Sequence, residues 1–89
     1  MADTMSSKMV AALEAAERAD AKGGLCWTVA GWIDPGDCWK YHNPVVVSRL
    51  VYDRGFLAVS GPRSGPRQRR FITKKGRGWL AEHRERTDA

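Results

Sequence analysis

The segment from residue 44 to residue 80 constrains the fold more than any other part of this sequence. Asn43-Pro44 is a capping residue followed by a proline suited to the first position of a helix. Apolar side chains then recur at helical spacing, at Val46, Val47, Leu50 and Val51. Gly55 is expected to end this helix. These signals predict a helix over residues 44–54, although the three consecutive valines alone would suit a strand.

A hairpin and a last helix are expected after this helix. Residues 56–60 and 69–73 have the composition of strands, and the loop between them, 61–68, contains two Gly-Pro pairs. Thr73 suits the cap of a helix that ends at about His83 or Glu85. Trp79 and Leu80 are its expected apolar anchors.

The first half of the chain predicts one helix and one strand. Ser6 or Ser7 can cap a helix over residues 8–22, which is rich in alanine. Gly23-Gly24 ends it, because one glycine can adopt the left-handed conformation of a helix C-terminus. Residues 25–30, LCWTVA, are typical of a short strand.

Residues 31–43 allow two interpretations. Asp34-Pro35-Gly36-Asp37 can form the turn of a hairpin, since proline followed by glycine suits a type II turn. The same residues can instead begin a short helix, with Asp34 as its cap and Pro35 in its first turn. We favour the helix because of the elements expected after it.

The expected order is therefore helix, strand, helix, helix, strand, strand, helix, which defines an α+β winged helix-turn-helix with a short or irregular second helix. A chain of 89 residues supports one domain. We expect this domain to span residues 7–85, between flexible ends at 1–6 and 86–89.

The second half of the sequence resembles winged helix-turn-helix proteins of the MarR type. In these a helix ends in Leu-Val-x-x-Gly-hydrophobic-Leu, and the wing returns into a Leu/Ile-Thr-x-x-Gly-Arg segment. The corresponding residues here are Leu50, Val51, Gly55, Phe56 and Leu57, then Ile72, Thr73, Gly76 and Arg77. The chain is also similar to small winged-helix proteins of phages and prophages. It departs from full MarR proteins by lacking their long dimerisation helices and by the Pro35-Gly36 break in its second helix.

Positive charge is concentrated in the same half of the chain. Residues 44–89 contain eleven Lys or Arg and four Asp or Glu, a net charge of +7, whereas residues 1–43 carry a net charge of −2. A basic half indicates a polyanionic partner, above all nucleic acid.

Double-stranded DNA is the partner that we expect, with the helix 44–54 in the major groove and the wing 60–70 on the backbone. This makes the chain a small cytoplasmic transcriptional regulator, and specific sites are usually recognised by dimers. RNA and an acidic protein partner are the alternatives, the latter on a protein-interaction module. The expected contacts are Val45, Ser48, Arg49 and Tyr52 on the helix and Arg63, Arg67, Arg69, Arg70, Lys74 and Lys75 on and after the wing.

Other functions find weaker support. Cys26, Cys38, His42 and His83 lack the paired short spacings of a zinc site, so no metal or cofactor is expected. Asp34 and Asp37 suit turn or cap positions better than a catalytic pair, and we expect no enzymatic activity. No apolar run approaches the roughly 18 residues of a membrane span, and the acidic N-terminus is unlike a signal peptide. The four tryptophans are expected in the core and wing: Trp27, Trp32, Trp39 and Trp79.

Overall fold

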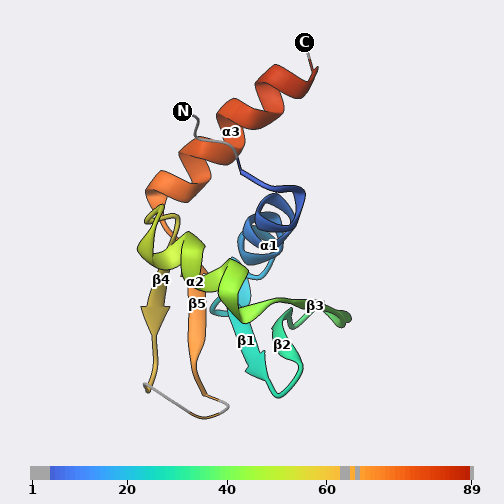
Figure 1. Cartoon of the computed structure of the whole chain (residues 1–89), viewed down its shortest axis with the longest axis vertical. Helices are drawn as coiled ribbons and strands as arrows, with labels where there is room; N and C mark the ends of the chain where they lie inside the picture. Colours follow the sequence, from blue (N-terminus) through green and yellow to red (C-terminus); the bar gives the residue numbers. More distant parts are fainter. Residues whose placement is uncertain (1–4, 63–64, 66, 89) are drawn as a thin grey trace.

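A computed structural model describes residues 5–62, 65 and 67–88, with the side chains of residues 85–88 left aside. Three α-helices and five strands form a two-layer α+β fold within these residues (Figure 1). In chain order they are α1 (Ser7–Arg18), the 3-10 turn η1 (Asp20–Lys22), β1 (Leu25–Thr28), β2 (Gly31–Asp34), β3 (Asp37–His42), α2 (Pro44–Tyr52), β4 (Leu57–Ser60), β5 (Arg69–Ile72) and α3 (Lys74–Asp88).

The five strands form one antiparallel sheet in the order β3-β2-β1-β5-β4. The hairpins β1–β2–β3 and β4–β5 are joined through the pairing of β1 with β5, in which Leu25 lies opposite Arg70. α2 connects the two edge strands, and Figure 1 shows it crossing the sheet from the side of β3 to the side of β4.

One face of the sheet carries the core. Alternate strand residues are buried on this face: Leu25, Trp32, Leu57 and Ile72. The helices cover them with α1 residues such as Leu13, with Val47 and Leu50 of α2, and with Leu80 of α3. The side chains on the opposite sheet face, such as Ile33 and Phe71, are only half-buried.

The first helix begins at its predicted cap, but it ends earlier than predicted. The Ser6 side chain accepts a hydrogen bond from the Met9 N–H at 3.2 Å, as an N-cap does. The α-helix ends at Arg18, earlier than predicted, and continues as η1 until Gly23, which has a φ of 92°. The short alanines allow α1 to pack closely against α2 and the sheet.

The predicted second helix is wrong, because residues 31–43 form the hairpin β2–β3. Asp34 Oδ1 accepts a hydrogen bond from the Gly36 N–H at 2.8 Å, so the aspartate stabilises a turn rather than a helix start. Pairing also places Trp32 opposite Trp27, with ring centroids 5.1 Å apart. Burial of this aromatic pair across two strands favours the sheet over the local helix signal.

The predicted winged helix-turn-helix fold is therefore wrong as well. The structure has three α-helices and a five-stranded sheet among its described residues, in the order α1-β1-β2-β3-α2-β4-β5-α3. A helix-turn-helix needs two successive helices, and β3 stands directly before α2 where the first of them was expected.

The elements after residue 43 are confirmed, apart from small shifts of their ends. Asn43 Oδ1 accepts from the Val45 N–H at 2.8 Å and caps α2, and Pro44 is its first residue. The Gly76 N–H donates to Thr73 Oγ1 at 3.1 Å, so Thr73 caps α3 as predicted. α3 runs to Asp88 and so extends beyond the predicted end at His83 or Glu85. The predicted flexible ends fall partly on residues 1–4 and 89, which lie outside the described residues.

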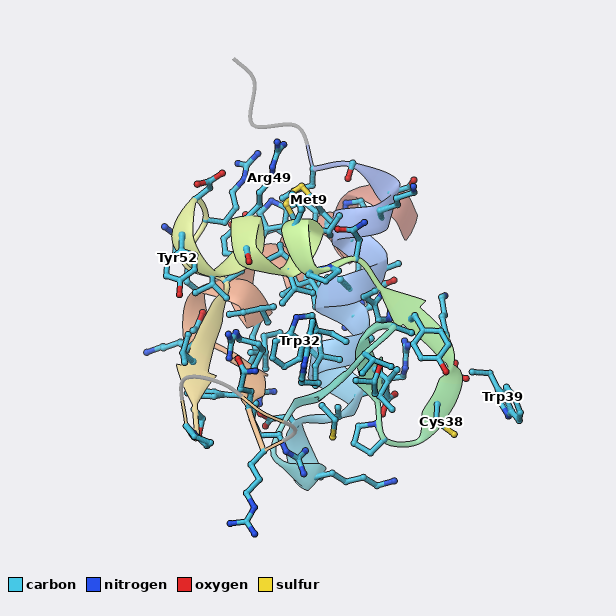
Figure 2. The ribbon with its side chains drawn as sticks, turned by 60° about the horizontal axis from the view of Figure 1, so that its bottom comes forward. Met9, Trp32, Cys38, Trp39, Arg49 and Tyr52 are labelled. Carbon is cyan, nitrogen blue, oxygen red and sulfur yellow. The ribbon has the colours of Figure 1, made fainter. Side chains whose placement is uncertain are left out.

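Three of the four tryptophans pack inside the fold, and the fourth does not. Trp32 is buried against the half-buried Trp27, and Trp79 packs on Phe56 at 5.9 Å between ring centroids. Trp39, however, is 89% exposed at the outer side of β3, and Figure 2 shows it pointing away from the body of the protein. The expectation that Trp39 belongs to the core is wrong. No helix in the described part is long and apolar enough to cross a membrane.

Candidate nucleic-acid interface

The exposed face of α2 carries the four side chains that the sequence suggested for base contact. Val45, Ser48, Arg49 and Tyr52 recur at i, i+3, i+4 and i+7 and therefore share one face of the helix. Val45 is 60% exposed and Tyr52 is 74% exposed, although both are large and apolar or aromatic. Figure 2 shows Arg49 and Tyr52 projecting outward from the end of α2 that is distant from β3.

These side chains border a shallow hollow on the protein surface. It is lined by the same four residues together with Pro44 and Asp53. We call this surface the α2 face. Val47 and Leu50 lie on the opposite side of the helix and hold it on the sheet, so the α2 face is presented to solvent.

Ion pairs engage Glu17 of α1, Asp20 of η1 and Asp34 of β2. Arg84 Nη2 of α3 lies 2.6 Å from Glu17 Oε1, and Arg77 of α3 pairs with Asp20. Arg18 of α1 lies 3.6 Å from the buried carboxylate of Asp34. Arg18, Arg77 and Arg84 therefore have ion-pair partners within the protein.

Several cationic side chains around the α2 face, by contrast, have no ion-pair partner in the described part of the chain. Within the described part of the chain, the Arg49 side chain has no hydrogen bond or ion pair. Lys8 and Lys40 are exposed near the N-terminal end of α2, where they line one pocket. Lys75, at the start of α3, lies beside Gly55 at the other end of α2 and 5.9 Å from the centre of the Phe56 ring. The positive charge here is available to an external anion.

The arginines of the hairpin β4–β5 are of two kinds: some bond to the rest of the protein, and others are exposed to solvent. Arg69 donates to the carbonyl oxygens of Lys22 and Gly24 at 3.1 and 3.3 Å, and so ties β5 to η1. Arg67 is exposed in the loop, as is Lys74 in the first turn of α3. Arg63 lies outside the described residues.

Arg70 is also engaged within the protein. Its guanidinium carbon lies 4.5 Å from the centroid of the Trp32 ring, and it donates to the Arg69 carbonyl at 3.0 Å and to Gln68 Oε1 at 3.4 Å. Burial lowers the pKa of Arg70 below its usual value, and Tyr52 nearby opposes the shift. Of the predicted wing contacts, Arg69 and Arg70 thus have structural roles, and Arg67 has its side chain exposed to solvent.

The fold adds Lys8 and Lys40, which the sequence did not suggest as contacts, and His42, which was weighed only for zinc. Lys8, Lys40 and His42 converge at the N-terminal end of α2, although Lys8 is more than thirty residues from the other two in sequence. The one local signal for this place is Asn43-Pro44, which marks a helix N-terminus and hence a partial positive charge. Only the packing of α1 against α2 and β2, with β3 paired to β2, brings the lysines to it.

The residues weighed for zinc are not brought together. No group of three or more His, Cys, Asp or Glu side chains suited to a metal ion occurs among the described residues. Cys26 lies in β1 and Cys38 in β3, both as free cysteines. Asp34 is held by the β2–β3 turn and by Arg18.

Comparison with known proteins identifies no relative. No family model matches the chain, and no curated protein or solved structure matches it either. The fold and surface define a small α+β protein with an exposed helix face that carries Arg49 and has Lys8 and Lys40 near its N-terminal end.

Proposed function

We propose that this protein binds double-stranded DNA, with the α2 face in the major groove and the surrounding cations on the phosphate backbone. The observation that carries the proposal is the placement of charge. Glu17, Asp20 and Asp34 are matched by ion pairs with arginines, whereas Arg49, Lys8 and Lys40 around α2 have no ion pair within the described residues.

The dimensions of α2 support this mode of binding. A helix fits the major groove, and the stripe from Val45 to Tyr52 extends over about 10 Å at 1.5 Å per residue. This length covers about three base-pair steps of roughly 3.4 Å. Arg49 can donate two hydrogen bonds to guanine, while Ser48 can bond a base or a phosphate. The exposed cations on Lys8, Lys40, Arg67, Lys74 and Lys75 would contact phosphates.

The salt dependence of duplex binding tests the proposal. If about four to six phosphates are contacted, log K falls with log salt concentration at a slope of about −4 to −5. The control is Lys22→Ala, because Lys22 is an exposed lysine of η1, outside the proposed surface. This variant should bind like the parent protein. Absence of binding to any duplex at low salt would contradict the proposal.

Two arginine variants separate base contact from phosphate contact. Arg49→Ala should lose about 1–3 kcal/mol of discrimination between a selected sequence and a scrambled one. Arg67→Ala should weaken binding to both duplexes equally. Selection of bound duplexes from a random pool supplies the sequence for this comparison, and a palindrome in it would indicate a dimer on DNA.

A second candidate function is binding of another protein through the α2 face. The exposed Val45 and Tyr52 favour it, because an apolar hollow rimmed by polar residues is typical of protein-interaction sites. The arginines would then meet an acidic surface on that partner. Capture of one partner that survives nuclease treatment and is lost in Tyr52→Ala would support this function over DNA binding.

A further inference from the structure

A pocket lies at the N-terminal end of α2, where α1, β3 and α2 meet. Its volume is about 210 Å³, and it is lined by Lys8, Ala11, Lys40, Tyr41, His42, Asn43 and Val46. This volume is about seven times the roughly 30 Å³ that one water molecule occupies in the liquid. A tetrahedral oxyanion therefore fits together with several waters.

The charge of the pocket is positive. Lys8 enters from α1 and Lys40 from β3, and neither side chain has an ion pair or hydrogen bond within the described part of the chain. No carboxylate is among the lining residues. Lys8 and Lys40 thus bring two positive charges to one pocket, and an anion bound there would be attracted by both.

Helix α2 adds backbone donors at the same place. Pro44 has no N–H, the Val45 N–H is capped by Asn43, and the Val47 N–H donates to the Asn43 carbonyl. The Val46 N–H has no acceptor among the described residues. A helix of nine residues also places a partial positive charge at this end.

His42 supplies an independent indication of a ligand. It is only 6% exposed, it lines the pocket, and its side chain has no hydrogen bond within the described residues. No fully buried side-chain nitrogen or oxygen lacks a partner among the described residues, so the ring nitrogens of His42 are reached from solvent at the pocket, where they can bond water or a ligand. Pairing of His42 with Trp32 in the β2–β3 ladder fixes its position.

The burial of His42 and the positive charges around it also favour the neutral form of its ring. Burial lowers the pKa of His42, and the positive charges of Lys40 and Arg18 lower it further, while Asp34 and Asp37 oppose the shift. The ring is therefore neutral near pH 7, with one N–H to donate. Lys8 is the remaining cation at the pocket.

We propose that this pocket binds a phosphate group, with Lys8 and Lys40 neutralising its charge and His42 donating a hydrogen bond from the floor. When the protein binds DNA as proposed above, this group is a backbone phosphate beside α2. This assignment rests on the proposed function. A free phosphate monoester offers the same chemistry.

NMR of the histidine side chains in the full-length chain tests the pocket. Inorganic phosphate and, separately, a short duplex are titrated while the His42 ring signals are followed. Both should shift these signals in a saturable way, and phosphate should raise the pKa of His42. Lys8→Gln and Lys40→Gln should each weaken phosphate binding about tenfold, because each removes one charge-assisted contact. Lys22→Gln is the matched control and should leave the phosphate affinity unchanged.

The outcomes separate this inference from the proposed function. Shifts with phosphate but none with the duplex would support the pocket, assign it to a free phosphate and contradict the DNA-binding mode. Duplex binding that depends on Arg49 but leaves the His42 signals unmoved by either titrant would overturn the pocket and retain DNA binding. Equal phosphate affinity of Lys40→Gln and the parent protein would also overturn it. Circular dichroism verifies that each variant is folded.

Discussion

The guanidinium of Arg70 lies over the ring of Trp32, with 4.5 Å between the guanidinium carbon and the ring centroid. Trp32 is 4% exposed, so Arg70 shields one of the largest apolar side chains of the core from water. A residue that appeared from its sequence position to face a nucleic acid thus also stabilises the sheet.

Replacement of Arg70 should therefore reduce stability. Arg70→Met keeps much of the aliphatic side chain but removes the cation and its hydrogen bonds, so the free energy of unfolding should fall by about 0.5–2 kcal/mol. Urea denaturation measures the change. Arg67→Met, in the exposed loop, is the matched control and should stay within about 0.5 kcal/mol of the parent protein. Equal stability of the two variants would show that the contact with Trp32 contributes nothing.

The two glycines of α3 should respond to alanine in opposite directions. A Cβ at Gly76 would collide with the Phe56 carbonyl oxygen, which is held by a hydrogen bond from the Thr73 N–H. Gly76→Ala should cost about 1–3 kcal/mol. A Cβ at Gly78 meets nothing within 4 Å, and Gly78→Ala should stabilise the helix by about 0.5–1 kcal/mol. Thermal unfolding of both variants checks the sign of each change in stability. Destabilisation by Gly78→Ala would contradict the packing of α3.

The β2–β3 turn should depend on Asp34. Asp34→Ala loses the hydrogen bond from the Gly36 N–H and the ion pair with Arg18, and should cost about 1–3 kcal/mol in urea denaturation. Asp34→Asn keeps an acceptor for the turn and should lose less, because Arg18 is half-exposed and its ion pair is weak. Asp37→Ala, on the exposed side of the turn, serves as the control. A larger loss in Asp37→Ala than in Asp34→Ala would be inconsistent with this turn.

Stability should depend on pH through His42. The folded state lowers its pKa below the ordinary value of 6.5, mainly through burial, so the unfolded chain binds the proton more tightly. The contribution of neutral His42 is thus fully present above about pH 6.5 and is lost as the pH falls through the lower folded-state pKa. Denaturation at a series of pH values should show this loss in the parent protein and in His83→Gln, but not in His42→Gln. A pH dependence that persists in His42→Gln would assign it to another group.

Local signals in the sequence were sufficient for α1, α2 and α3 and for the hairpin β4–β5. Ser6, Asn43 and Thr73 cap their helices through short-range hydrogen bonds, which depend on neighbouring residues alone. The spacing along α2 also determined which of its faces is buried, because Val47 and Leu50 lie on the core side.

Residues 31–43 were decided by tertiary structure. Asp34-Pro35-Gly36 suits both a helix start and a turn, so local chemistry leaves the two nearly equal. Pairing of Trp32 with Trp27 and with His42 is a contact between strands, and it selects the turn. This choice replaces a helix by two strands and changes the fold from the predicted one.

The sequence by itself determined the helix caps, the amphipathic α2 and the concentration of positive charge in the second half of the chain. The tertiary structure alone decided which cations remain available to a partner. Arg69 and Arg70 are held by backbone carbonyls and Trp32, whereas Lys8 and Lys40 converge beside His42 at the start of α2. The reason is that capping and periodicity act over a few residues, while ion pairs, stacking and pockets depend on residues that only folding brings together.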